Sequence, residues 1–251
     1  MSNFTKNEFL HIFIIAIVLS FIFSFRSWGA TTFDALIGVF NWLLFLFIAF
    51  LSLVIYESAH KIVAYHHNAS SKMEIWFIKR LGFPPSSHSG RKTFFGLYFT
   101  IPKIPIGIIL SLILIFVSNG KFIFASLHNT IISSKRDLRI KHKHLFLTNF
   151  EIATIALAGP IISLLVALIA TNLGFPDIAK LNYFIAIFSM LPLHSLDGGK
   201  IFIGSRALYV FSIVFIIFSI ILLQSLTLVS TILMALMIAI ILVIIYYYKS
   251  E

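Results

Sequence analysis

The chain contains no cysteine, which excludes disulfide bonds, thiolate metal sites and a cysteine nucleophile. Any metal or acid–base chemistry must therefore come from histidine and carboxylate side chains. Charged residues are scarce as well, at 11% of the 251 residues, whereas apolar residues make up 59%. Because soluble domains carry about 25% charged residues, this composition excludes a soluble globular chain and predicts an integral membrane protein.

Acidic residues are the rarer of the two charged classes, with 9 Asp and Glu against 19 Lys and Arg. The basic residues lie in loops beside apolar runs, as the positive-inside rule and anionic lipid headgroups produce. The net charge of +10 therefore indicates a lipid bilayer as partner, and we expect no nucleic acid partner.

Strand-like alternation of polar and apolar residues is also absent from the apolar runs, which excludes a transmembrane barrel. Runs of about 17 to 23 residues are long enough to cross a hydrocarbon core as helices. The sequence therefore predicts an all-α polytopic membrane protein with about six transmembrane helices. The predicted spans are residues 9–25, 33–56, 150–173, 181–203, 207–223 and 226–247.

A further apolar stretch, residues 104–127, is interrupted by Ser118-Asn119-Gly120-Lys121 and is preceded by Pro102 and contains Pro105. We expect it to enter and leave the membrane on one face, as a re-entrant or interfacial segment. With the N-terminus inside, nearly all basic residues then lie in the cytoplasm, and the protein is multi-pass with both termini cytoplasmic. A single crossing would place the basic cluster at 135–143 on the far side.

The whole chain, residues 1–251, is predicted to form one membrane-embedded domain. Its core is 33–205, in which 57–149 carries the cytoplasmic basic loops and the re-entrant segment, and 206–251 forms a C-terminal helical hairpin. Residues 68–100 combine glycine, proline and aromatic residues and are predicted to form turns and short strands. A strand edge in this loop is the expected docking site for an extended peptide.

Glu57 and His60 stand at the end of a charge-free apolar run, three residues apart and hence on one helix face. An ionisable residue at such a place is paired, functional, or a cap at the membrane interface. A zinc protease helix needs two histidines one turn apart and a glutamate after the first. Tyr56 occupies the position of that first histidine.

The second motif is residues 191–200, in which Pro192 and the Gly198-Gly199 pair are predicted to break a span. Asp197 would then point into the bundle and offer a carboxylate ligand for Zn²⁺. Under the predicted topology it reaches the membrane side on which Glu57 and His60 lie. A simple turn at a membrane exit is the alternative interpretation of Asp-Gly-Gly.

The third motif is Ala158-Gly159-Pro160, small residues that permit close helix approach, followed by a proline. In this order on consecutive spans, the three motifs resemble the site-2 protease family of intramembrane zinc metalloproteases. That family carries His-Glu-x-x-His, then Ala-Gly-Pro, then Pro-x-x-Pro-Leu-Asp-Gly. The resemblance covers roughly residues 40–205 as a pattern of motifs, with Ser195 in place of the second motif proline and Tyr56 in place of the first histidine.

The resemblance implies a zinc metalloendopeptidase that cleaves transmembrane segments of membrane proteins. His60 and Asp197 would hold Zn²⁺ with His194 or Tyr56 as third ligand, and Glu57 would be the catalytic general base. The substrate would be a membrane-protein helix.

Two alternatives remain open at the level of sequence. Tyr56 favours a metal-free, catalytically degenerate relative that binds membrane-protein partners. A transporter that uses Glu57 and Asp197 as a cation site is the third class. The histidines at positions 11, 88, 128, 142 and 144 are interpreted as loop or span-end residues without a role.

Overall fold

The computed structural model describes residues 4–28, 33–77, 91–94, 97–100, 104–135 and 146–250, with the backbone alone for 91–94, 97–100 and residue 250. The histidines at 88, 142 and 144, Pro102, much of the predicted strand-rich loop and most of the basic cluster at 135–143 lie outside these residues.

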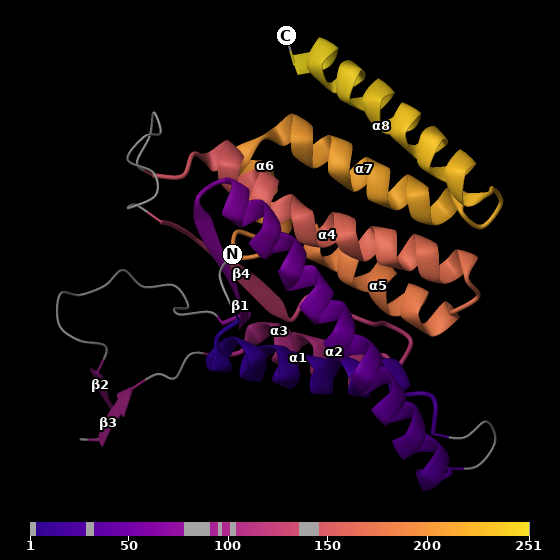
Figure 1. The fold of residues 1–251 in the computed structure, drawn as a ribbon. Helices are drawn as coiled ribbons and strands as arrows, with labels where there is room; N and C mark the ends of the chain where they lie inside the picture. Colours follow the sequence, from indigo (N-terminus) through magenta and orange to yellow (C-terminus); the bar gives the residue numbers. More distant parts are fainter. Residues whose placement is uncertain are drawn as a thin grey trace.

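The described part of the chain is mostly helical. Its elements are α1 (Lys6–Ser24), α2 (Ala35–His66), β1 (Ala69–Ile75), β2 (Arg91–Phe94), β3 (Leu97–Thr100), α3 (Ile106–Val117), β4 (His128–Ser134), α4 (Asn149–Asn172), α5 (Pro176–Ser189), α6 (Asp197–Gly204), α7 (Arg206–Leu222) and α8 (Leu228–Ser250). In Figure 1, α8 lies at one edge of the molecule beside α7, and α1 and α3 lie at the opposite edge.

Four of the described helices, α1, α2, α4 and α8, are long and apolar enough to cross a membrane. The structure thus supports a helical membrane protein but does not confirm six spans. The predicted span 181–203 is divided between α5 and α6, and α7, with 17 residues, is shorter than the four. Most side chains of α8 face outward, as expected for a helix that contacts lipid.

Several helix starts follow directly from local sequence. Thr5 and Glu8 form a capping box at the start of α1, and Thr148 and Glu151 form another at the start of α4. The Asp34 carboxylate accepts hydrogen bonds from the first backbone amides of α2. These caps satisfy backbone donors that a helix leaves unpaired, so the helix boundaries are set by short-range chemistry.

A two-stranded antiparallel sheet joins β1 to β4, with Ala69 opposite Ser134 and Ile75 opposite His128. A second pair, β2 and β3, forms a hairpin. Short strands were predicted within 68–100, but β4 was not, because residues 128–134 lie in the part of 57–149 that was assigned to cytoplasmic basic loops. The strand was missed because β4 is stabilised by its pairing with β1, a distant segment of the chain. The local sequence does not reveal that pairing.

The apolar stretch after β3 turns back on itself. Helix α3, with 12 residues, is about 18 Å long and ends before Ser118, and the following chain is not helical. A Cβ on Gly107 would contact Leu127, and one on Gly120 would overlap Phe25 and Arg26 at the end of α1. The two ends of the stretch therefore lie together, while its tip reaches the far end of α1.

Residues 190–196 separate α5 from α6 and are not helical. The break precedes Pro192, as expected because proline disfavours helical backbone in the residue before it. The glycine pair does not break the helix as predicted. Gly198 and Gly199 lie inside α6, where a Cβ would overlap the carbonyls of Met190 and Leu193, so they allow the first turn of α6 to pack against the break.

Candidate functional site: a buried polar network

Tyr56, Glu57 and His60 lie in the last third of α2, and none of them is exposed. Asp197 is the first residue of α6 and is 2% exposed. The Tyr56 hydroxyl donates to Asp197 Oδ2 over 2.6 Å, and His60 Nε2 lies 3.7 Å from the same oxygen. The structure therefore brings together the two motifs that the sequence singles out. Tyr56, His60 and Asp197, together with Thr130 and Lys200, are called the polar network.

Both oxygens of the Asp197 carboxylate have donors within the chain. Lys200 Nζ lies 2.9 Å from Oδ1, and the Thr130 hydroxyl lies 3.4 Å from Oδ2, in addition to Tyr56. Lys200 also donates to Asn129 Oδ1 over 3.1 Å. A buried carboxylate is costly unless it is paired and hydrogen-bonded, and here this requirement is met by protein groups.

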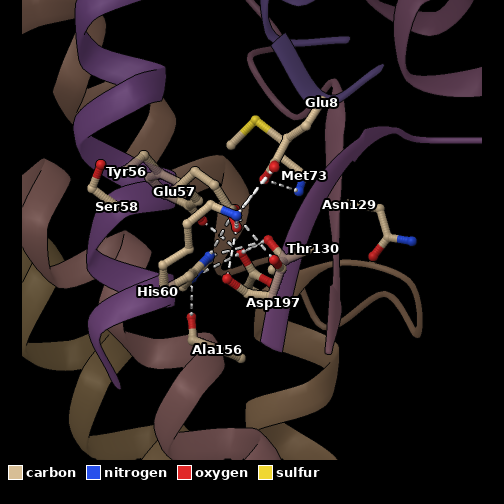
Figure 2. A network of polar contacts seen from close by, with 12 residues as sticks. Glu8, Tyr56, Glu57, Ser58, His60, Met73, Asn129, Thr130, Ala156 and Asp197 are labelled. Atoms are coloured by element: carbon tan, nitrogen blue, oxygen red, sulfur yellow. Dashed lines mark hydrogen bonds and ion pairs between the residues drawn. The ribbon is translucent and has the colours of Figure 1, made fainter. Parts of the chain in front are cut away.

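The two nitrogens of His60 are also engaged (Figure 2). Nε2 lies 3.2 Å from the backbone carbonyl of Ala156, and Nδ1 lies 3.2 Å from the Thr130 hydroxyl. A carbonyl oxygen can only accept, so Nε2 carries the proton. That nitrogen, the one nearer to Asp197, has no free lone pair for a metal in this arrangement.

The Ala-Gly-Pro motif positions His60 in two ways. Gly159 leaves room for the imidazole and for the Tyr56 ring, since a Cβ there would overlap both. Pro160 lies inside α4 and has no backbone N–H, so the carbonyl four residues earlier lacks its helical partner. That carbonyl belongs to Ala156, and it accepts the hydrogen bond from His60.

Glu57 belongs to a second buried group, the charge cluster of Glu8, Glu57 and Lys61. Its Oε1 accepts from the Ser71 hydroxyl over 2.7 Å and lies 3.8 Å from Lys61 Nζ. Lys61 is 1% exposed and pairs more closely with Glu8 of α1, at 2.8 Å. Glu57 Oε2 has no hydrogen-bond partner among the described residues and lies 3.6 Å from His60 Nδ1.

Sequence reasoning missed the contribution of β4. His128 was assigned no role, yet it is 3% exposed and its ring lies 4.7 Å from that of Tyr56. Burial lowers the pKa of the His128 imidazole to about 4, although the Asp197 carboxylate opposes this effect. His128 and Thr130 are two residues apart and so share one strand face, but this signal is readable only once the strand is known.

Lys200 was missed for a different reason. It follows Asp197 by three residues and so shares a helix face with it, a signal that the sequence does contain.

His194 does not lie where a third zinc ligand would have to be. It is exposed, in the turn before α6. The prediction required a helix that carries His194 and Asp197 on one face, but α6 begins only at Asp197. No described contact joins His194 to the polar network.

The polar network does not fit a zinc centre. Among the residues that the structure describes, no three His, Asp or Glu side chains are grouped so as to hold a metal ion. Tyr56 lies beside His60 and Asp197, and its hydroxyl donates its proton to the carboxylate. A catalytic zinc site needs three protein ligands whose free lone pairs point at the metal, which keeps one open position. Here the side chains of the polar network form hydrogen bonds with neighbouring protein groups instead.

Comparisons with protein-family models, with curated proteins and with solved structures find no match to this chain.

Proposed function

We propose that the protein is a metal-free relative of the site-2 proteases that binds membrane-protein partners and does not cleave them. The observation that carries this proposal is the 2.6 Å hydrogen bond from Tyr56 to Asp197. It fills, with a neutral hydroxyl, the place where the family has a ligand histidine. The resemblance in motifs accounts for the architecture, and the substitution accounts for the loss of chemistry.

Charge balance supports the proposal. The Asp197 carboxylate has an ammonium group at 2.9 Å from Lys200, so a divalent cation is not needed to offset its charge. Hydrogen bonds to charged groups contribute about 1.5–3 kcal/mol each. Zinc binding would have to break the bonds of Asp197 and remove the proton from His60 Nε2.

The proposed topology is multi-pass, with both termini in the cytoplasm. Three of the four apolar helices, α1, α2 and α4, pack against one another or through α2, and basic residues flank them in the loops. The stretch 104–127 is proposed as a re-entrant hairpin, supported by the closeness of Gly107 to Leu127. Residues 124–127 of its return chain are buried, so at this part protein, not lipid, surrounds the non-helical backbone, as membrane depth requires.

A zinc protease is the second candidate, favoured by one observation. Glu57 Oε2 is buried without a hydrogen-bond partner among the described residues. A general base needs such a free oxygen next to the reacting water, whereas a purely structural carboxylate is normally saturated.

Zinc content separates the two candidates. Protein purified in mild detergent is analysed for metal as wild type, Tyr56→His and the matched control Tyr56→Phe. We expect no stoichiometric zinc in wild type and in the Phe variant, and about one zinc per chain in the His variant, because that change completes a three-ligand site. Adding His60→Ala to Tyr56→His should remove the metal again.

The opposite result is equally clear. About one zinc in wild type, lost in His60→Ala and in Asp197→Ala, would overturn the metal-free proposal. A cleavage assay with a membrane-embedded test substrate then examines the base, since Glu57→Gln should abolish proteolysis if the second candidate is correct.

A further inference from the structure

Three consecutive residues of strand β4 contact the side chains that α2 and α6 contribute to the polar network. The His128 ring packs against Tyr56 at 4.7 Å between ring centroids, and Asn129 accepts from Lys200 over 3.1 Å. The Thr130 hydroxyl lies within hydrogen-bond distance of both His60 and Asp197. Each residue of this short stretch therefore meets a different part of the site.

The backbone of β4 is held by β1 alone among the described strands. The other edge of β1 is already occupied by the charge cluster, because the Met73 amide donates to Glu8 Oε1 and the Ser71 carbonyl accepts from Lys61. Within the predicted docking segment 68–100, the edges of β1 are thus occupied, on one side by side chains and on the other by β4. An extended peptide can pair with β1 only where β4 now lies.

β4 satisfies the site incompletely. With the strand in place, His128 Nδ1 and Glu57 Oε2 are buried and have no hydrogen-bond partner among the described residues. The single Thr130 hydroxyl is shared between His60 and Asp197 but can donate to only one of them at a time. Unpaired buried polar atoms weaken an interface, so this occupant is replaceable by a segment that fits better.

Backbone pairing along one edge and side chains in separate contacts are the features of peptide recognition by strand addition. We propose that the edge of β1, together with Tyr56, His60, Asp197 and Lys200, is a binding site for an extended segment of a partner membrane protein. The chain's own β4 occupies this site until the partner displaces it. The inference rests on the proposed binding function and names the form of the partner at that site.

The side chains that the partner segment needs follow from the contacts that His128, Asn129 and Thr130 now make. The partner segment presents an aromatic or imidazole ring toward Tyr56, an acceptor toward Lys200 and a hydroxyl or amide toward His60 and Asp197. Such a segment is polar and extended, as are the three residues of β4 that it replaces. Helical transmembrane segments must unwind locally to bind.

A reversible lock on β4 tests the proposal, and the cysteine-free chain makes the chemistry selective. Ser70 and Ser133 are opposite each other, with their hydroxyl oxygens 2.8 Å apart. Ser70→Cys/Ser133→Cys therefore places two thiols within disulfide reach. The probe is a synthetic peptide with the sequence of residues 125–134 that carries a photoreactive group at the exposed position of Ile131.

The lock is combined with Asn129→Leu/Thr130→Val, which removes the polar contacts of β4 with little change in volume. We expect photolabelling of the reduced full-length protein to exceed that of the oxidised protein by about tenfold, given the usual strength of such hydrogen bonds. In the matched control, Ile131→Thr, on the exposed face of the same strand, takes the place of Asn129→Leu/Thr130→Val. This control should be labelled no more strongly than the cysteine variant that lacks Asn129→Leu/Thr130→Val.

If the variant with Asn129→Leu/Thr130→Val does not fold, Ser70→Cys/Ser133→Cys alone is used at a higher peptide concentration. The reduced protein should again be labelled more strongly than the oxidised protein. More peptide is needed because the chain's own β4 competes at an effective concentration of about millimolar. Equal labelling of oxidised and reduced protein, or no labelling of either, would overturn the proposal. A peptide in which the Asn and Thr positions are Leu and Val should label weakly, and equal labelling by it would also count against the site.

Metal content and the mass of the probe are measured in the same samples. A cleaved probe together with bound zinc would defeat the metal-free function while leaving the peptide site in place. An intact, unlabelled probe with no zinc would defeat the peptide site and leave the metal-free function standing.

Discussion

The two buried carboxylates of the site, Asp197 and Glu57, differ in how fully they are paired. Asp197 has donors on both oxygens, from Lys200 on one and from Tyr56 on the other, and it shares the Thr130 hydroxyl with His60. Glu57 has one hydrogen bond from Ser71, a more distant ammonium group, and one oxygen without a partner among the described residues. The chain therefore supplies a hydrogen-bond donor to each oxygen of the Asp197 carboxylate, whereas the Glu57 carboxylate can accept a further hydrogen bond.

The difference follows from the elements that supply the donors. Asp197 meets side chains from α2, β4 and its own helix, while Glu57 shares Lys61 with Glu8 of α1. Lys61 lies 2.8 Å from Glu8 but 3.8 Å from Glu57, so its charge is directed mainly at Glu8. The contrast can be tested by substitutions that affect one side at a time.

The largest effect is expected for Lys61→Ala. The substitution leaves Glu8 and Glu57 buried without their cation, and breaking a buried ion pair by removing one partner costs about 3–5 kcal/mol. Thermal unfolding in detergent should show a large loss of stability. Lys72→Ala, an exposed lysine on β1, is the control and should change stability little; equal effects of the two would contradict the assignment of Lys61.

A smaller but unequal effect is expected from neutralising each carboxylate. Asp197→Asn removes the negative charge that pairs with Lys200 and one of the two acceptor oxygens, and should destabilise the protein by about 2 kcal/mol, within the range for hydrogen bonds to charged groups. Glu57→Gln should cost less, about 1 kcal/mol, because Glu8 still pairs with Lys61. The comparison fails if the order of the two measured losses is reversed.

A pH dependence is expected from His128. Its pKa is about 4 in the folded protein against about 6.5 when unfolded, so between these values the unfolded chain binds more protons. This contribution to stability is therefore fully present above pH 6.5 and is lost as the pH falls toward 4. Denaturation followed over this range should show a shallower fall for His128→Gln, and an unchanged slope would refute the role of His128.

An effect smaller than that of Asp197→Asn is expected for Tyr56→Phe, which removes one of the donors to Asp197 and keeps the ring that packs between His60 and His128. The loss should be about 1.5 kcal/mol, the lower end for a hydrogen bond to a charged group, since Lys200 and Thr130 still serve the carboxylate. A loss as large as that of Lys61→Ala would mean that Lys200 and Thr130 do not compensate for the lost hydroxyl of Tyr56. Unfolding of both variants in one detergent provides the measurement.

Much of the helical architecture could be predicted from local pattern. Long apolar runs located α1, α2, α4 and α8, and Pro192 indicated the interruption between α5 and α6. The close approach predicted at Ala158-Gly159-Pro160 is confirmed at Gly159. The role of Pro160 was missed, because freeing the carbonyl of Ala156 matters only when a donor such as His60 is placed beside it.

By itself the sequence determined that the chain is a helical membrane protein, that Glu57 and His60 share a helix face, and that Tyr56 directly precedes Glu57. These features depend on composition and on helical spacing, which act over a few residues. Only the tertiary structure decided that Tyr56 donates to Asp197, 141 positions away, and that β4 covers both. Such contacts depend on how distant segments pack, and short-range periodicity carries no information about that packing.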